Sequence, residues 1–121
     1  MAVEKKINSG RRRVPRRYFD TLVGVLLHGK YNMERTFQVG EGGMMISSLE
    51  PLTQGTQVVA NFYLKAGTII IVRGVVRSVI PAQGKYPVRY GLEFLNLGFQ
   101  FKREIRNFVA AATRLEGQVA L

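Results

Sequence analysis

Turn residues recur at short intervals along most of the chain, and this spacing constrains the fold more than any other feature. Between the turns lie short apolar segments that partly alternate with polar residues, which is the pattern of β-strands. These segments cover residues 21–28, 35–39, 44–47, 57–64, 68–80 and 87–95. Because only short connections separate them, we predict about six strands that pair as antiparallel neighbours.

The apolar period changes after Gly98, from the two of a strand to the 3.6 of a helix. One apolar stripe then recurs at helical spacing and consists of Phe101, Ile105, Phe108, Val109, Ala112 and Leu115. We predict an amphipathic helix over about residues 98–116 that packs across an open end of the sheet or barrel. A helix that binds a partner or a membrane surface is the alternative. The pattern as a whole predicts an all-β fold with a terminal helix.

A chain of 121 residues has room for one domain with a modest core. We divide it into a basic N-terminal arm, residues 1–19, and a folded domain over residues 20–121. The N-terminus lacks the apolar run of a signal peptide, and no apolar stretch is long enough to span a bilayer. We therefore expect a cytoplasmic location.

Positive charge is concentrated at the N-terminus. The formal net charge is +10, and residues 1–20 hold seven basic residues against two acidic ones. Five of these bases are the arginines of the segment RRRVPRR, residues 11–17. Such a block attracts polyanions over long distances, with a strong dependence on salt. A solvated tail that only aids solubility is the alternative.

The outward side chains of the last two predicted strands include three arginines. Alternation turns one set inward, namely Ile70, Val72, Val76, Ile80, Val88, Tyr90, Leu92 and Phe94. A hairpin through residues 81–85 would place Arg77 opposite Arg89, and Arg73 opposite Glu93. Two arginines directly opposite one another repel, so this pair either splays into solvent or holds an anion.

The inventory of reactive side chains argues against an enzyme. The chain has one histidine, His28, one aspartate, Asp20, and no cysteine. A Ser-His-Asp triad would need both single residues, which lie at opposite ends of one predicted strand. A histidine or cysteine metal cluster cannot be assembled. Glu41 and Glu50 lie in loops without a partner pattern. We therefore predict no catalysis, no metal and no cofactor.

Four features together resemble one bacterial family. An arginine-rich arm leads into the first strand, and a glycine turn ending in Gly42-Gly43 precedes Met44-Met45-Ile46. The strands GVVRSVI and YGLEFLNL then precede the terminal helix. Over residues 11–115 this order is similar to that of PilZ domains. The resemblance implies a six-stranded antiparallel β-barrel with a C-terminal helix, and a receptor for the second messenger cyclic di-GMP in motility or biofilm regulation.

The resemblance also implies ligand-binding residues in the arm. Family members use an RxxxR motif there, which matches Arg12 and Arg16, or Arg13 and Arg17, in this sequence. The segment RVPR favours the first match. A guanidinium group can fork onto phosphate oxygens or a guanine edge and stack on a base, so it suits a ligand with two phosphates and two guanines.

A second family motif, (D/N)xSxxG, falls on the glycine turn. Here the turn reads QVGEGG, with Gln38 in place of Asp or Asn, Gly40 in place of Ser, and Gly43 as the matching glycine. The amide of Gln38 can pair with a guanine edge, and the backbone of Gly40 can donate to a phosphate. We add Arg77 and Arg89 to the predicted ligand-binding residues because they lie on the outer face.

Three functions remain open from the sequence. The first is a receptor that binds one or two molecules of cyclic di-GMP and relays the signal to a protein partner. The second is a degenerate PilZ domain that binds no nucleotide and acts as a protein-interaction module. The third is a nucleic-acid-binding barrel, suggested by the charge and by aromatic residues near the arm, Tyr18, Phe19, Tyr31 and Phe37.

Overall fold

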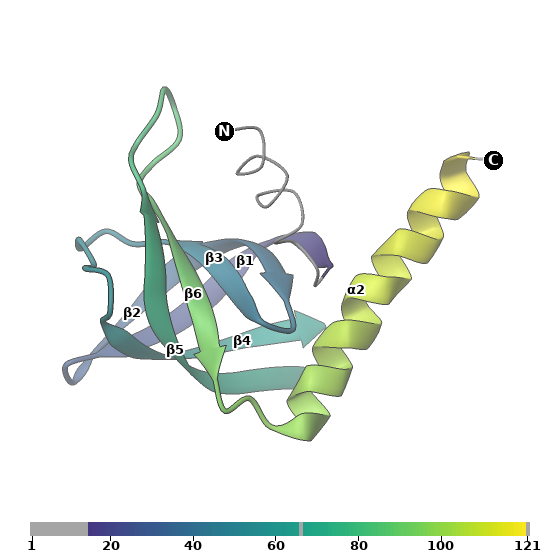
Figure 1. Ribbon diagram of the computed structural model, residues 1–121, viewed down its shortest axis with the longest axis horizontal. Helices are drawn as coiled ribbons and strands as arrows, with labels where there is room; N and C mark the ends of the chain where they lie inside the picture. The colour runs from purple at the N-terminus through teal and green to yellow at the C-terminus, as the bar shows by residue number, and fades with distance from the viewer. Residues whose placement is uncertain (1–14, 66, 121) are drawn as a thin grey trace, which may run out of the picture.

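The alternating apolar segments form the lining of a closed β-barrel (Figure 1). The computed structural model describes residues 15–65 and 67–120, with side chains up to residue 111. Within these ranges the elements are β1 (Arg16–Leu27), β2 (Lys30–Gly40), β3 (Gly43–Ser47), β4 (Gln57–Lys65), β5 (Thr68–Ile80), β6 (Arg89–Leu95) and α2 (Phe99–Ala120). All neighbouring strands are antiparallel, and the barrel order is β1-β2-β3-β6-β5-β4. The predicted strands and terminal helix are confirmed.

The inward residues of every strand build one hydrophobic core. The side chains of Val23, Val39, Ile46, Ile70 and Val76 are completely buried. In the last two strands the predicted inward set is buried, except that Ile80 and Val88, at the hairpin end, are half-buried. Burial of branched apolar side chains, at about 25 cal/mol per Å², is the main force that closes such a barrel.

The first strand begins earlier than the sequence pattern indicates. Its alternating apolar residues start near Thr21, but β1 starts at Arg16, where Arg16 pairs with Gly40 and Arg17 with Val39. The backbone of the arginine segment thus supplies the ladder, with an irregularity between Tyr18 and Thr21. Polar residues pair here because ladder hydrogen bonds come from the backbone and need no apolar side chain.

The predicted register of the last two strands was wrong. Val75 pairs with Glu93 and Ile80 with Arg89, and the pairing shifts between Val76 and Ser78. The connection between the strands spans residues 81–88, and the residue skipped by the ladder is Arg77. A bulge of this kind redirects a side chain. As a result, Arg77 does not face Arg89; its Nε lies 2.6 Å from Oε1 of Glu93.

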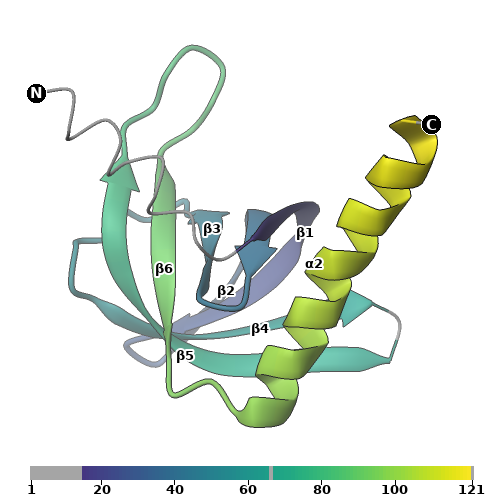
Figure 2. The ribbon, with the colours of Figure 1, turned by 45° about the vertical axis from the view of Figure 1, so that its right-hand side comes forward.

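Helix α2 closes one end of the barrel with its N-terminal half. Ile105 is fully buried, and the Phe108 ring packs edge-on against Phe19 at 5.1 Å between centroids. Phe19 in turn contacts Phe62 of β4 at 6.2 Å. The prediction that this stripe packs internally is confirmed up to Val109, and the side chains of Ala112 and Leu115 lie outside the description. The C-terminal half of α2 stands away from the strands (Figure 2).

None of the helices in the described ranges has the length and apolar character needed to cross a bilayer.

Candidate functional site

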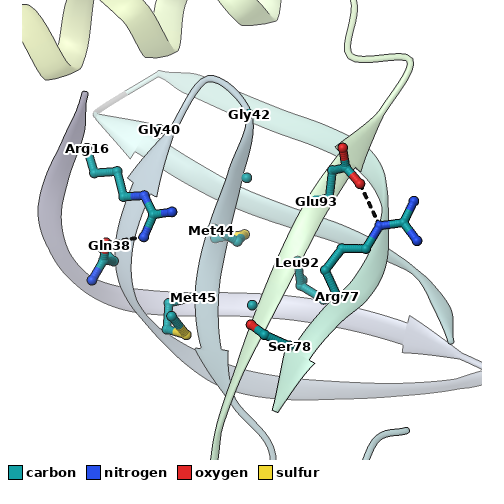
Figure 3. Close-up of a pocket in the computed structure, with 12 residues that line it drawn as sticks. Arg16, Gln38, Gly40, Gly42, Met44, Met45, Arg77, Ser78, Leu92 and Glu93 are labelled. Atoms are coloured by element: carbon teal, nitrogen blue, oxygen red, sulfur yellow. Dashed lines mark hydrogen bonds and ion pairs between the residues drawn. The ribbon is translucent and has the colours of Figure 1, made fainter. Parts of the chain in front are cut away.

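A pocket of about 380 Å³ opens on the barrel surface over β2, β3 and β6, with residues of β1 and β5 at its sides. Its lining consists of Arg16, Gln38, Gly40, Gly42, Gly43, Met44, Met45, Arg77, Ser78, Gly91, Leu92 and Glu93. Figure 3 shows Arg16 and Gln38 on one side, Arg77 and Glu93 on the other, and the two methionines between them. The pocket therefore has two polar walls and an apolar floor.

The two neighbouring arginines at the start of β1 contact different parts of the protein. Arg16 is exposed, and its Nη1 donates a hydrogen bond to Oε1 of Gln38 at 3.2 Å. Arg17 lies 3.8 Å above the centroid of the Phe108 ring, and its Nη1 donates to the Phe108 carbonyl oxygen at 3.0 Å. Strand alternation sends the two side chains to opposite faces. Arg16 consequently lines the pocket, whereas Arg17 fastens β1 to α2.

The glycine turn between β2 and β3 is tied to the helix through Glu41. The Glu41 carboxylate accepts hydrogen bonds from Nε of Arg106 at 2.9 Å and from Nη2 at 3.1 Å. These bonds hold the pKa of Glu41 below its ordinary value of 4.5, with a further contribution from the charges of Arg106 and Lys102, and partial burial opposes them. The same bonds raise the pKa of Arg106. Both oxygens of the Glu41 carboxylate are therefore hydrogen-bonded to an arginine of α2.

At two glycines of the turn, another backbone segment lies too close to leave room for a side chain. A Cβ on Gly43 would lie 2.0 Å from the carbonyl oxygen of Leu92, so β3 can pair with β6 here only through glycine. A Cβ on Gly40 would lie 2.8 Å from the carbonyl oxygen of Pro15. The backbone just before β1 thus crosses directly over Gly40, in the space that a serine side chain would occupy.

Opposite the turn, Arg77 and Glu93 form an exposed ion pair at the pocket wall. Arg89 lies outside the pocket lining; its guanidinium carbon is 5.4 Å from the centroid of the Tyr86 ring. Its Nε is buried and has no hydrogen-bond partner among the described atoms. The two arginines predicted to face each other therefore occupy separate environments.

The pocket brings together five of the nine residues predicted from the sequence: Arg16, Gln38, Gly40, Gly43 and Arg77. Arg17 and Arg89 are placed elsewhere, and Arg12 and Arg13 lie outside the described residues. The sequence reasoning missed Glu93 and Ser78 as lining residues. Alternation places Glu93 outward, but the bulge at Arg77 that brings the two together leaves no signal in an apolar pattern.

Side chains suited to metal binding do not form a cluster among the residues that the structure describes. Across residues 15–65 and 67–111 no group of three or more His, Cys, Asp or Glu residues could hold an ion. His28 is exposed and occupies the turn between β1 and β2 with a φ of 52°.

Solved structures share this fold. Inhibitor of motility (MotI/DgrA) from Bacillus subtilis aligns with a TM-score of 0.75 at 14% identity, over 85% of this chain and 51% of that chain. The PilZ domain of YcgR from Escherichia coli with c-di-GMP aligns with a TM-score of 0.70 at 17% identity, over 91% of this chain and 97% of that domain. The K. pneumonia MrkH–c-di-GMP complex aligns with a TM-score of 0.67 at 18% identity, over 92% of this chain and 56% of that chain. This chain therefore spans about half of MotI and of MrkH, and nearly all of the YcgR domain.

No curated protein matches the sequence. The PilZ domain family model matches residues 10–111, which is most of the chain and includes the pocket, the glycine turn and the helix segment that packs on the barrel. The chain therefore belongs to the PilZ domain family.

Proposed function

We propose that this PilZ domain binds cyclic di-GMP in the pocket between Arg16 and Arg77 and relays the signal to a protein partner. The observation that carries the proposal is the placement of two guanidinium groups on opposite walls of one pocket, with the glycine turn beside them. PilZ domains are ligand-binding receptor domains rather than enzymes, and the YcgR and MrkH structures contain c-di-GMP.

Arg16 has the chemistry for a phosphate or a guanine. Its guanidinium lies at the pocket edge, and its bond to Gln38 is an exposed one that a ligand can replace at little cost. In the RxxxR motif the partner of Arg16 is Arg12. The contact of Arg17 with α2 supports this match over Arg13 and Arg17. Arg12 would then reach the ligand from the arm.

Arg77 supplies the second cation. Its ion pair with Glu93 uses Nε, which keeps the side chain at the pocket wall and leaves the two terminal nitrogens for an anion. Glu93 acts in this proposal as a positioning residue, since its own carboxylate repels phosphate. Met45, which is half-buried on the outer side of β3, offers a soft apolar floor on which a purine can lie, whereas the side chain of Met44 belongs to the core.

The relay follows from the contacts of residues next to the site. Glu41 of the turn bonds Arg106 of α2, and Arg17 next to Arg16 stacks on Phe108 of the same helix. A ligand that moves the turn or the arm therefore changes the forces on α2. We infer that the surface read by the partner includes this helix.

One observation favours a second candidate, a PilZ domain that binds no nucleotide. Gln38 and Gly40 replace the acidic or amide residue and the serine of the family motif, and the Gln38 oxygen already accepts a bond from Arg16. In that case the arginine arm would bind an acidic protein surface.

Isothermal titration of cyclic di-GMP into the purified protein at physiological salt separates the two candidates, with GMP and a short single-stranded DNA as controls. We expect saturable heat from the cyclic dinucleotide alone. Absence of heat at high ligand concentration would contradict the proposal, and equal, strongly salt-dependent binding of the DNA would indicate an unselective polyanion site.

A further inference from the structure

One outer face of the barrel, away from the pocket, is apolar. Seven large side chains on β2, β1, β4 and β5 are each 40–62% exposed: Leu22, Leu26, Tyr31, Met33, Tyr63, Ile69 and Ile71. They alternate along their strands with buried core residues, so they point outward together. We call this set the apolar face.

Strand register makes the apolar face continuous. Leu26 lies between Tyr31 on β2 and Val59 on β4. In the neighbouring row, Gly24 and Asn61 lie side by side between Met33 and Ile71. Cross-strand neighbours of this kind have their side chains in contact distance. The four strands therefore present one surface rather than scattered residues.

The centre of the apolar face has no gap at Gly24, and the tyrosine hydroxyl that lies there has a hydrogen-bond partner. Tyr31 leans over Gly24, where its hydroxyl takes the space of a side chain, only 1.9 Å from the Cβ position. The same hydroxyl donates a hydrogen bond to Oδ1 of Asn61 at 3.1 Å. Tyr31 thus covers the gap left by Gly24, and a second surface could pack here without stranding this hydroxyl.

The apolar face has the size of an interface. Seven such side chains, each about half exposed, present roughly 700 Å² to solvent, which exceeds the largest apolar patch of an ordinary monomer. A standard interface buries about 800 Å² on each partner. An uncovered patch of this size would also cost solubility.

The charges around the apolar face are balanced. Arg35 pairs with Asp20 at 3.1 Å beside Leu22, and Lys65, two residues after Tyr63, lies 4.0 Å from Glu104. Among the described cations of β2, β4 and β5, only Arg73 lacks an ion pair with another described residue. The strong positive charge of the chain is therefore not a property of this surface, and an acidic partner would find little to attract it.

We propose that the apolar face binds a second copy of the chain, sheet against sheet, in a two-fold dimer. A balanced rim suits a copy of itself, because each Arg35–Asp20 and Lys65–Glu104 pair can exchange partners across the interface. Antiparallel sheets pack face to face at about 10 Å through interleaved side chains, and the outer surfaces of two barrels can meet in the same way over their shared apolar strands. The dimer does not depend on nucleotide binding.

Sedimentation equilibrium of the full chain tests the dimer at about 5 to 300 µM. We expect the mass to rise with concentration from 13.6 kDa towards twice that value. Leu22→Glu should raise the dimer Kd by at least about tenfold, because it places a charge within the proposed interface. Leu49→Glu is the matched control, since Leu49 is 93% exposed in the loop after β3, and its Kd should equal that of the wild type.

A wild-type protein that stays monomeric over this range would overturn the proposal and leave the apolar face to a different protein. Equal dimerisation of the wild type and Leu22→Glu, or equal weakening by Leu49→Glu, would overturn it as well. Thermal melts verify folding, and Ile71→Glu repeats the test on β5 should Leu22→Glu unfold. Titration of cyclic di-GMP into Leu22→Glu keeps the two proposals distinct, because Leu22 lies outside the pocket lining.

Discussion

Arg106 holds Glu41 by two parallel hydrogen bonds, from Nε at 2.9 Å and from Nη2 at 3.1 Å. The pair joins residues 65 positions apart in the chain, one in the glycine turn and one on the second turn of α2. Paired geometry fixes the angle between the two groups as well as their distance. The turn that borders the pocket is therefore oriented by the helix.

Removing this clamp is expected to weaken ligand binding without a direct ligand contact being lost. Arg106→Ala frees the turn, so the ligand must order it, and we expect the affinity for cyclic di-GMP to fall by about three- to tenfold. Arg103→Ala on the same helix, where the side chain stacks on Phe99, is the control and should bind like the wild type. Titration calorimetry measures both, and equal affinities for all three proteins would refute the coupling.

The same pair predicts a pH dependence of stability. The pKa of Glu41 is lowered in the folded protein by the bonds from Arg106, so the pair stabilises the fold fully above the ordinary pKa of 4.5. Its contribution is lost as the pH falls through the lower, folded-state pKa. Glu41→Gln should therefore be less stable than the wild type at pH 7, and the difference should vanish in acid. Urea unfolding at a series of pH values gives this difference, and a constant offset would contradict it.

Arg16 is predicted to dominate the affinity for cyclic di-GMP. Arg16→Ala removes charge-assisted hydrogen bonds to the ligand, and we expect an affinity loss of about 10- to 100-fold. The melting temperature of the free protein should stay unchanged, because the side chain is exposed. Arg73→Ala removes an exposed arginine outside the pocket lining and serves as the charge-matched control. Similar losses in both variants would indicate only nonspecific attraction.

Arg17 is predicted to contribute to stability rather than to binding. Arg17→Ala removes the stacking on Phe108 and the bond to its carbonyl oxygen, and we expect a loss of about 1 to 2 kcal/mol in the free energy of unfolding. Arg17→Lys retains the charge but not the planar group, so it should recover only part of this loss. Denaturant unfolding measures both variants. A large drop in cyclic di-GMP affinity with unchanged stability would instead assign Arg17 to the ligand.

Gly40→Ser restores the serine of the family motif, yet we expect it to impair this protein. The new Cβ would lie 2.8 Å from the carbonyl oxygen of Pro15, so the backbone that leads into β1 must move away from the turn. We expect the affinity for cyclic di-GMP to fall by about tenfold. Gly42→Ser meets no atom within 4 Å and is the control for a serine in the same turn. Tighter binding by Gly40→Ser would show that the hydroxyl outweighs the displacement.

Periodicity was a good guide to the fold because burial decides which side chains face inward. The alternation in β4 and β5 and the helical stripe from Phe101 to Val109 all describe surfaces that the core covers. The start of β1 was not visible in this way, since Arg16 to Tyr18 join the sheet through backbone pairing while their side chains stay polar or exposed.

The candidate site was predictable where the residues carry a motif and not where geometry brings them together. Arg16 and the glycine turn follow from the resemblance to the family. The partner of Arg77 depended on the shift between Val76 and Ser78, which exchanges Arg89 for Glu93. Ladder irregularities of a single residue have no counterpart in composition or apolar period.

A single peptide bond separates Arg16, whose side chain lines the pocket, from Arg17, whose side chain contacts α2. The Cα atoms of Arg16 and Arg17 are about 3.8 Å apart across a planar peptide bond, so a displacement of the backbone at one residue is passed directly to the other. If a partner binds better to one position of α2, nucleotide binding changes the affinity for the partner. Thermodynamic reciprocity then requires the partner to change the affinity for the nucleotide by the same factor. The partner would then act as an effector of the receptor as much as its target.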